Sequence, residues 1–221
     1  MSGRQGIICE MVQKKLMEQK TEPKRRGRPR GYDPEEALAR AAATFWKAGY
    51  AATSLDELVA ATGMNRPSLY AAFGDKREIY LKTLDHYMEE GQALARAALA
   101  GDPPLRVFLK RFYDKALDLY YGDGPRGCYT VGTAATVAMV DDDVRKFLAD
   151  RVRNADDFLK KQIEKGRERG EIARDADAAA LAYLATATLH TLAVRSRAGI
   201  PRKELEALAK AAIAVICGKP G

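Results

Sequence analysis

The chain has 221 residues, enough for one or two domains with a sizeable buried core. Hydrophobic residues make up 47% and charged residues 30%, a balance that excludes a disordered chain and is typical of a soluble globular protein. Residues 1–30 hold nine Lys or Arg and three Glu, so they carry +6 of the net charge of +7. A basic arm on a near-neutral body predicts a polyanionic partner.

Cysteine usage and the apolar runs indicate the compartment. The three cysteines are odd in number and far apart, which excludes a disulfide framework and indicates reducing conditions. The first twenty residues lack the apolar stretch of a secretory signal. The longest uncharged run, Ala178–Val194, is rich in Ala and Thr and contains His190, so we interpret it as a buried helix. We expect a cytoplasmic protein with no membrane partner.

The chain begins with the basic arm and continues as helices. Residues 1–31 show little apolar periodicity and are predicted to be disordered. From residue 32 onward no stretch alternates with period two, which predicts an all-α fold. The first helix is expected after Asp33, with Pro34 at its first position, and Gly49 ends it.

Two short helices are predicted next. Thr53 and Ser54 each open a capping-box pattern, so either can begin the first of them. Gly63 provides a tight turn, and Asn65 can cap a second short helix over 66–73. With a longer helix on each side, this arrangement predicts a helix-turn-helix unit.

A longer set of helices follows. Asp75 and Glu78 open a long helix, and residues 101–104 (Gly-Asp-Pro-Pro) break the chain. Beyond this break the apolar periodicity predicts helices over 105–121, 128–140, 143–169, from Asp175 to about 197, and after 199–201 to Gly218. The acidic run 141–143 resembles a cation site, but at a helix start it is explained more simply as a cap.

The second short helix has the chemistry of a DNA-recognition helix. Such a helix needs short side chains that let its backbone enter the major groove, and a few donors that reach bases or phosphates. Leu69 and Phe73, four residues apart, can anchor the helix to the core. Arg66, Ser68 and Tyr70 would then point outward.

An ordered series of residues resembles the DNA-binding domain of TetR/AcrR-family regulators, specifically over about residues 32–85. The series comprises Phe45, Trp46, Gly49, Tyr50, Thr53, Ser54, Leu55, Leu58, Val59, Thr62, Gly63, Asn65, Pro67, Ser68, Leu69, Tyr70, Phe73, Gly74, Asp75 and Lys76. The resemblance implies an all-α homodimeric transcriptional regulator, usually a repressor that a small ligand releases from its operator. It implies a helix-turn-helix domain over 32–85 and a helical ligand-binding and dimerisation domain over 86–221.

The resemblance also implies DNA-contacting residues. By position, it implies that Thr53, Tyr70 and Lys76 contact phosphates. It implies base contacts by Arg66, Pro67 and Ser68. Ala71 and Ala72 stand where many relatives carry larger residues, so base readout from that end is expected to be poorer.

The basic arm contains a second DNA-binding pattern. Residues 25–31 include Gly-Arg-Pro, which resembles the core of an AT-hook, and Arg28 and Arg30 would enter the narrow minor groove of A·T-rich DNA. A disordered solubilising tail is the alternative.

The C-terminal half offers candidates for an effector pocket and a dimer interface. An apolar or aromatic ligand is expected to meet a subset of the inward aromatic and hydroxyl side chains, from Tyr87, Phe112, Tyr113, Tyr129, Thr133, Met139 and Phe158. Small residues and apolar spacing in the last two helices predict that a two-fold axis pairs them, through Ala182, Ala185, Leu189, Leu205, Leu208 and Ala212.

Other functions have weaker support in the sequence. The histidines are single and far apart, and no cluster has metal-ligand spacing, so we expect no metal and no cofactor. An enzyme using Cys128 and His190 would lack every recognisable phosphate-loop or nucleophile motif. Two alternatives stay open: an architectural DNA-binding protein without ligand response, and a thiol-based redox or electrophile sensor that uses Cys128.

Overall fold

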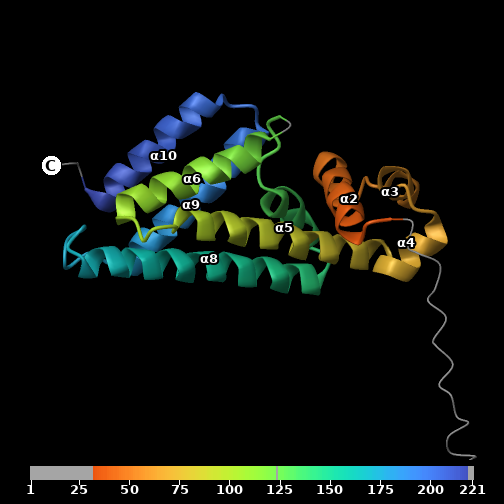
Figure 1. Cartoon of the computed structure of the whole chain (residues 1–221), viewed down its shortest axis with the longest axis horizontal. Helices are drawn as coiled ribbons and strands as arrows, with labels where there is room; N and C mark the ends of the chain where they lie inside the picture. The colour runs from red at the N-terminus through yellow and green to blue at the C-terminus, as the bar shows by residue number, and fades with distance from the viewer. Residues whose placement is uncertain (1–31, 123, 219–221) are drawn as a thin grey trace, which may run out of the picture. The chain divides into compact units, whose positions relative to one another are not determined.

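The computed structural model describes residues 32–122 and 124–218, and the expected basic arm with Arg28 and Arg30 lies outside these ranges. From Pro34 onward the chain forms one compact unit of helices, and the described ranges contain no strand, which confirms the all-α prediction (Figure 1). None of the helices in these ranges combines the length and the hydropathy that crossing a bilayer requires. The elements are α2 (Pro34–Ala48), α3 (Leu55–Thr62), α4 (Arg66–Phe73), α5 (Lys76–Ala98), α6 (Leu105–Tyr121), η1 (Thr130–Ala134), α7 (Ala135–Val137), α8 (Asp142–Glu168), α9 (Ala178–Arg197) and α10 (Arg202–Cys217).

The short helices α3 and α4 are fixed by side-chain caps at their first turns. Ser54, not Thr53, caps α3, and Glu57 completes a capping box by accepting from the Ser54 N–H at 2.6 Å. Gly63 ends α3 with a φ of 68°, in the left-handed region that glycine enters without strain. The Asn65 side chain then accepts from the Ser68 N–H at 2.9 Å and starts α4.

Helix α5 begins at the predicted capping box of Asp75 and Glu78 and continues without a break to Ala98. It extends from the end of the molecule where α2, α3 and α4 gather into the region of the long C-terminal helices (Figure 1). The expected domain boundary between residues 85 and 86 therefore lies inside a helix and not in a linker. We call α2–α4 with the first turns of α5 the head, and α6–α10 the body.

The segment 128–140 is predicted as one helix, and it is helical from residue 129 to residue 137. Its middle is the π-helical turn η1, which continues into the single turn α7, and residues 138–140 form a turn before α8. Hydroxyls compete for the backbone here, since Thr133 Oγ1 donates to the Tyr129 carbonyl and Thr136 Oγ1 to the Thr133 carbonyl. Met139, in the closing turn, is consequently 78% exposed.

The long helices α8 and α9 occur where predicted, with adjusted starts. Asp141 caps α8 by accepting from the N–H groups of Asp143 and Val144, as the interpretation of the acidic run as a cap requires. Asp177, not the predicted Asp175, caps α9, because its carboxylate accepts from the N–H groups of residues 179 and 180.

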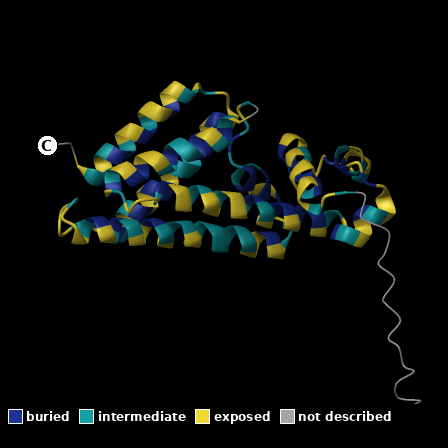
Figure 2. Ribbon diagram, viewed as in Figure 1, coloured by how far each residue is buried: buried dark blue, intermediate teal, exposed yellow. Residues whose placement is uncertain are grey.

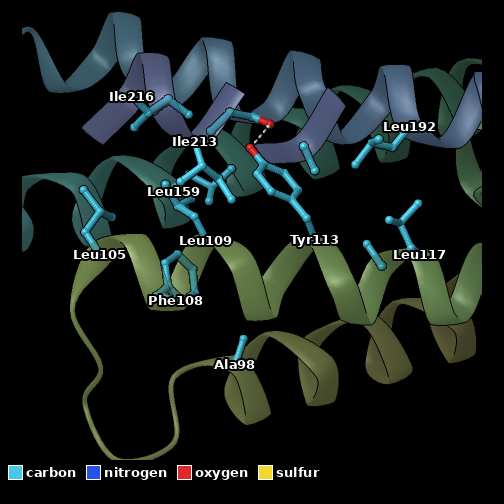
Figure 3. Close-up of a cluster of buried hydrophobic side chains, with 14 of the residues drawn as sticks. Ala98, Leu105, Phe108, Leu109, Tyr113, Leu117, Leu159, Leu192, Ile213 and Ile216 are labelled. Atoms are coloured by element: carbon cyan, nitrogen blue, oxygen red, sulfur yellow. Dashed lines mark hydrogen bonds between the residues drawn. The ribbon is translucent and has the colours of Figure 1, made fainter. Parts of the chain in front are cut away.

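The core of the body lies between α6, α9 and α10, with one side of α8. Figure 3 shows Leu109 and Tyr113 of α6 pointing toward Ile213 and Leu159, and all four side chains are buried. Each of the three aliphatic side chains contributes on the order of 1.5–3 kcal/mol by leaving water. The Tyr113 hydroxyl donates to the Ala185 carbonyl at 3.0 Å, which satisfies the polar atom inside this core.

Candidate DNA-binding site and its connections to the body

The outward face of α4 carries the predicted recognition residues. Arg66 and Pro67 are exposed at its first turn, Ser68 is half-buried, and Tyr70 is 40% exposed. On the opposite side Leu69 is fully buried, which fixes the helix to the core of the head. The helix therefore presents polar groups on a rigid support, as direct readout of base edges requires.

Arg66 does not stand alone on this face. Its Nη2 donates to Asp56 Oδ1 at 2.6 Å, an ion pair that joins the first turn of α4 to the first turn of α3. The two side chains remain 50% and 83% exposed. The sequence does not predict Asp56 as a partner, because a separation of ten residues across a turn gives no local signal.

Two further predicted contacts have different surroundings. Thr53 is 1% exposed, and its Oγ1 donates to the Gly49 carbonyl at 2.8 Å, so the hydroxyl closes a turn and does not face the surface that DNA could reach. Lys76, at the first position of α5, places its Nζ 4.6 Å from the centre of the Tyr50 ring. This cation–π contact keeps the ammonium beside the head while leaving it partly accessible to a phosphate.

A polar joint connects the head to the body. Trp46 of α2 donates through Nε1 to the Arg126 carbonyl at 3.0 Å, and the Arg126 guanidinium lies 4.2 Å from the centre of the Trp46 ring. Arg197, in the last turn of α9, donates to the carbonyls of both residues. These contacts span 80 and 151 positions in sequence, so no periodicity could reveal them.

A second connection joins the start of α5 to the start of α8. Arg77 donates to the carboxylates of Asp141 and Asp143. The hydrogen bond from Arg77 lowers the pKa of Asp141, and the backbone N–H of Val144 lowers it further. A displacement of α8 would therefore act directly on the helix that follows α4.

Between these connections lies a cluster of aromatic side chains from the head, α5 and the segment before η1. Its members are Phe45, Trp46, Tyr50, Tyr80, Tyr87 and Tyr129, with ring centres 4.8–6.2 Å apart. The Tyr80 hydroxyl donates to Thr133 Oγ1, and the Tyr129 hydroxyl shares a hydrogen bond with Thr83, both at 2.8 Å. Burial raises the pKa of Tyr80 to about 12, so its phenol stays neutral.

The seven predicted effector residues lie in two separate groups, with Met139 apart from both. Tyr87, Tyr129 and Thr133 belong to the aromatic cluster and its hydrogen bonds. Phe112 lies beside Tyr113 and Phe158, and Phe112 and Phe158 pack against Phe108. Tyr113 is part of the body core, and the exposed Met139 lines no interior, because the helix expected to turn it inward ends at residue 137.

A cleft of about 210 Å³, part of it open solvent, lies between the start of α6 and the end of α8. Asp102, Lys165 and Arg169 line it, and Asp102 is already paired with both cations. The cleft contains none of the seven predicted effector residues.

Of the six residues predicted for the dimer face, three are buried within the single chain and three are half-buried. Ala182, Ala185 and Leu205 are at most 1% exposed, because they pack inside the protomer. Leu189, Leu208 and Ala212 are half-buried. The apolar side chains that remain in water on these helices include Tyr183, Leu184, Val194 and Val215, which are 37–68% exposed. Figure 2 shows exposed positions along the outer side of α10, away from α6.

Cys128 lies beside the aromatic cluster between the head and the body. Its Sγ is 3.5 Å from the Tyr87 hydroxyl, which donates to it, and the side chain is half-buried. Within residues 32–122 and 124–218, no three His, Cys, Asp or Glu side chains are grouped as metal ligands.

The capped pair of short helices with its outward donors defines a helix-turn-helix DNA-binding protein. The family model "Bacterial regulatory proteins, tetR family" matches residues 37–83, and the model "Tetracyclin repressor-like, C-terminal domain" matches residues 106–212. The chain belongs to the TetR family of bacterial transcriptional regulators.

Named relatives cover most of the chain. The HTH-type transcriptional repressor ComR of Escherichia coli (strain K12) is 29% identical over 84% of this chain and 90% of ComR. A cysteine mutant of the TetR family regulator CifR, complexed with 26-bp double-strand operator DNA, is 30% identical with a TM-score of 0.79, covering 88% of this chain and all of that chain. A TetR regulator from Rhodococcus sp. RHA1 is 34% identical with a TM-score of 0.58, and the match covers 82% of this chain and 97% of that chain.

Proposed function

We propose that this protein is a homodimeric repressor that binds a near-palindromic double-stranded operator in the cytoplasm and leaves it when a small effector binds. The observation that carries the proposal is the exposed first turn of α4, where Arg66, Pro67 and Ser68 lie on a helix anchored by the buried Leu69. In this function Arg66 contacts a base edge, and Tyr70 and Lys76 contact phosphates.

The operator complex of CifR and the repressor name of ComR support this proposal, since both proteins are similar to the chain over most of its length. We also retain the division into a helix-turn-helix domain over 32–85 and an effector-binding and dimerisation domain over 86–221. The continuity of α5 across that division gives the body a rigid connection to the head.

The exposed apolar side chains of α9 and α10 support the dimer. Leu184 and Val194 on α9 and Val215 on α10 lie in water in the single chain. A two-fold axis that pairs these faces would bury both copies of the apolar surface at once. The same axis would place two copies of α4 about one DNA turn apart, roughly 34–36 Å, which is why a near-palindrome is expected.

The connections between head and body support effector release. An effector that separates elements of the body would change the positions of Arg126 and Arg197 relative to Trp46, or of α8 relative to Arg77. Either change tilts α4 away from the spacing that DNA demands. An apolar or aromatic molecule suits the surrounding aromatic side chains, which bear hydroxyls at Tyr87 and Tyr129.

The test measures fluorescence anisotropy of labelled DNA from the region flanking the protein's own gene, against random DNA at the same salt concentration. Operator binding should exceed random binding by about a thousandfold or more. Arg66→Ala should cost about 1–3 kcal/mol at one base position per half-site, whereas Lys76→Ala should weaken all DNA equally and flatten the salt dependence. A metabolite panel then identifies the molecule that releases the DNA.

Equal affinity for operator and random DNA would instead identify an architectural protein. Release by an electrophile that a Cys128→Ser variant ignores would identify the thiol-sensor alternative, which the hydrogen bond from Tyr87 to Cys128 favours as a second candidate.

A further inference from the structure

We propose that Asp56 is a positioning residue for base recognition, which orients the guanidinium of Arg66 toward a guanine. The proposal rests on the base-reading role given to Arg66 above. It adds a residue on α3 that determines specificity through Arg66.

The geometry of the pair leaves Arg66 able to read a base. The hydrogen bond joins Nη2 to a single carboxylate oxygen of Asp56. A guanidinium has five N–H donors in a planar fork, so most of them stay available. Held at one nitrogen, the guanidinium samples fewer orientations, and its remaining N–H donors can match the paired O6 and N7 acceptors of guanine.

The cap of α3 does not require Asp56, because Ser54 and Glu57 satisfy each other at its first turn. A carboxylate in the first turn also favours the helix dipole, and Glu57 already supplies one there. An ion pair between two side chains as exposed as these contributes little to folding. An unpaired carboxylate beside the outward face of α4 would repel phosphates, so its presence is best explained by what it does to Arg66.

The pair of Asp56 and Arg66 also distinguishes guanine from other bases. When Arg66 meets guanine, it can keep the Asp56 contact and gain the base contact. At other bases the negative charge of Asp56 faces DNA with less compensation, which penalises the wrong sequence. Asp56 therefore reduces affinity for random DNA and increases selectivity at one base pair per half-site.

The experiment compares full-length Asp56→Asn with the wild-type protein on operators in which each half-site position is varied in turn, and on random DNA at the same salt. We expect the preference for guanine at the Arg66 position to fall by about fivefold to tenfold, while random DNA binds more tightly. The double variant Asp56→Asn with Arg66→Ala should show the same base preference as Arg66→Ala alone.

Asp142→Asn is the matched control, because Asp142 is also an exposed first-turn carboxylate paired with an arginine, Arg145, but belongs to α8. It should leave base preference unchanged. Thermal melting checks that each variant folds. If Asp56→Asn does not fold, Asp56→Ala replaces it in the same experiment.

Preference for guanine retained within about twofold in the folded Asp56 variant would overturn the inference, even if random DNA bound more tightly, since that is a charge effect alone. If Arg66→Ala itself kept the preference, the base-reading role in the proposed function would fail first, and the inference with it.

Discussion

The head and the body differ in what holds their helices and in what they leave in water. In the head, α3 and α4 have only eight residues each, and both start at a side-chain cap. In the body, α8 and α9 also start at side-chain caps, whereas α6 and α10 start after Pro104 and Pro201, which provide none, and packing around Tyr113 and its neighbours stabilises them. Short helices depend on local stabilisation because nucleation is costly, whereas long amphipathic helices gain most of theirs from burial, with or without a cap.

The exposed chemistry differs in the same way. The head presents Arg66, Ser68 and Lys76, which can bind a polyanion, whereas α9 and α10 present Leu184, Val194 and other apolar side chains. The polar surface fits DNA, and the apolar surface is the one that the proposed dimer would bury. Variants in the two regions should therefore fail in different ways.

The largest effect is expected from a charge on the apolar face of α9. Leu184→Glu should prevent pairing of two copies, because a buried unpaired carboxylate costs several kcal/mol. A monomer holds one α4 and loses the second half-site, so operator binding should fall by more than about a hundredfold. Size-exclusion chromatography with light scattering and anisotropy measure the two losses.

Val107→Glu is the matched control, since Val107 on α6 is 38% exposed and Leu184 is 37% exposed. It should leave mass and DNA affinity unchanged. Leu184→Glu that remained a dimer with full affinity would move the interface away from α9.

The next effect compares the two cores. Leu69→Ala and Leu109→Ala remove side chains that are both fully buried, so each should lower the free energy of unfolding by about 2–5 kcal/mol. Under conditions where both variants are folded, only Leu69→Ala should weaken operator binding, because Leu69 supports α4 directly. Urea unfolding and anisotropy decide this, and equal losses of DNA affinity would show that the regions are not separable.

The same contrast explains what the sequence could and could not predict. Start and stop signals at Asn65, Gly63 and Asp75 are local, so the short helices of the head occur at the predicted residues. On α9, small residues indicated close approach, but the sequence could not distinguish approach within the protomer from approach between copies. Ala182 and Ala185 pack inward, and Tyr183 and Leu184 are exposed. The joint of Trp46, Arg126 and Arg197 depends on tertiary folding alone.

A smaller effect is expected at the caps. Asn65→Ala and Asp177→Ala each remove a side chain that accepts from backbone N–H groups at a helix start, at a cost of about 1 kcal/mol in the free energy of unfolding. Fraying of the first turn of α4 displaces Arg66, so Asn65→Ala should also weaken operator binding. Asp177→Ala should not, and a loss of DNA affinity in that variant would mean that the start of α9 communicates with the head.

The smallest effect is a pH dependence that belongs to the body. Burial lowers the pKa of His190, and the nearby charge of Asp156 opposes this only in part. Because the folded chain holds this imidazole neutral, the unfolded chain binds a proton first as the pH falls below about 6.5. The contribution of His190 to the free energy of unfolding should therefore be at its maximum above that pH. It should decrease as the pH falls, until the pH passes the lowered pKa of the folded state. His190→Gln should flatten the dependence of the free energy of unfolding on pH between about pH 7 and pH 5.5, above the range in which carboxylates titrate.

Urea unfolding at several pH values measures this dependence. The comparison is His86→Gln, a change at the chain's other histidine. A slope that disappeared in His86→Gln and persisted in His190→Gln would contradict the assignment and place the pH response in α5.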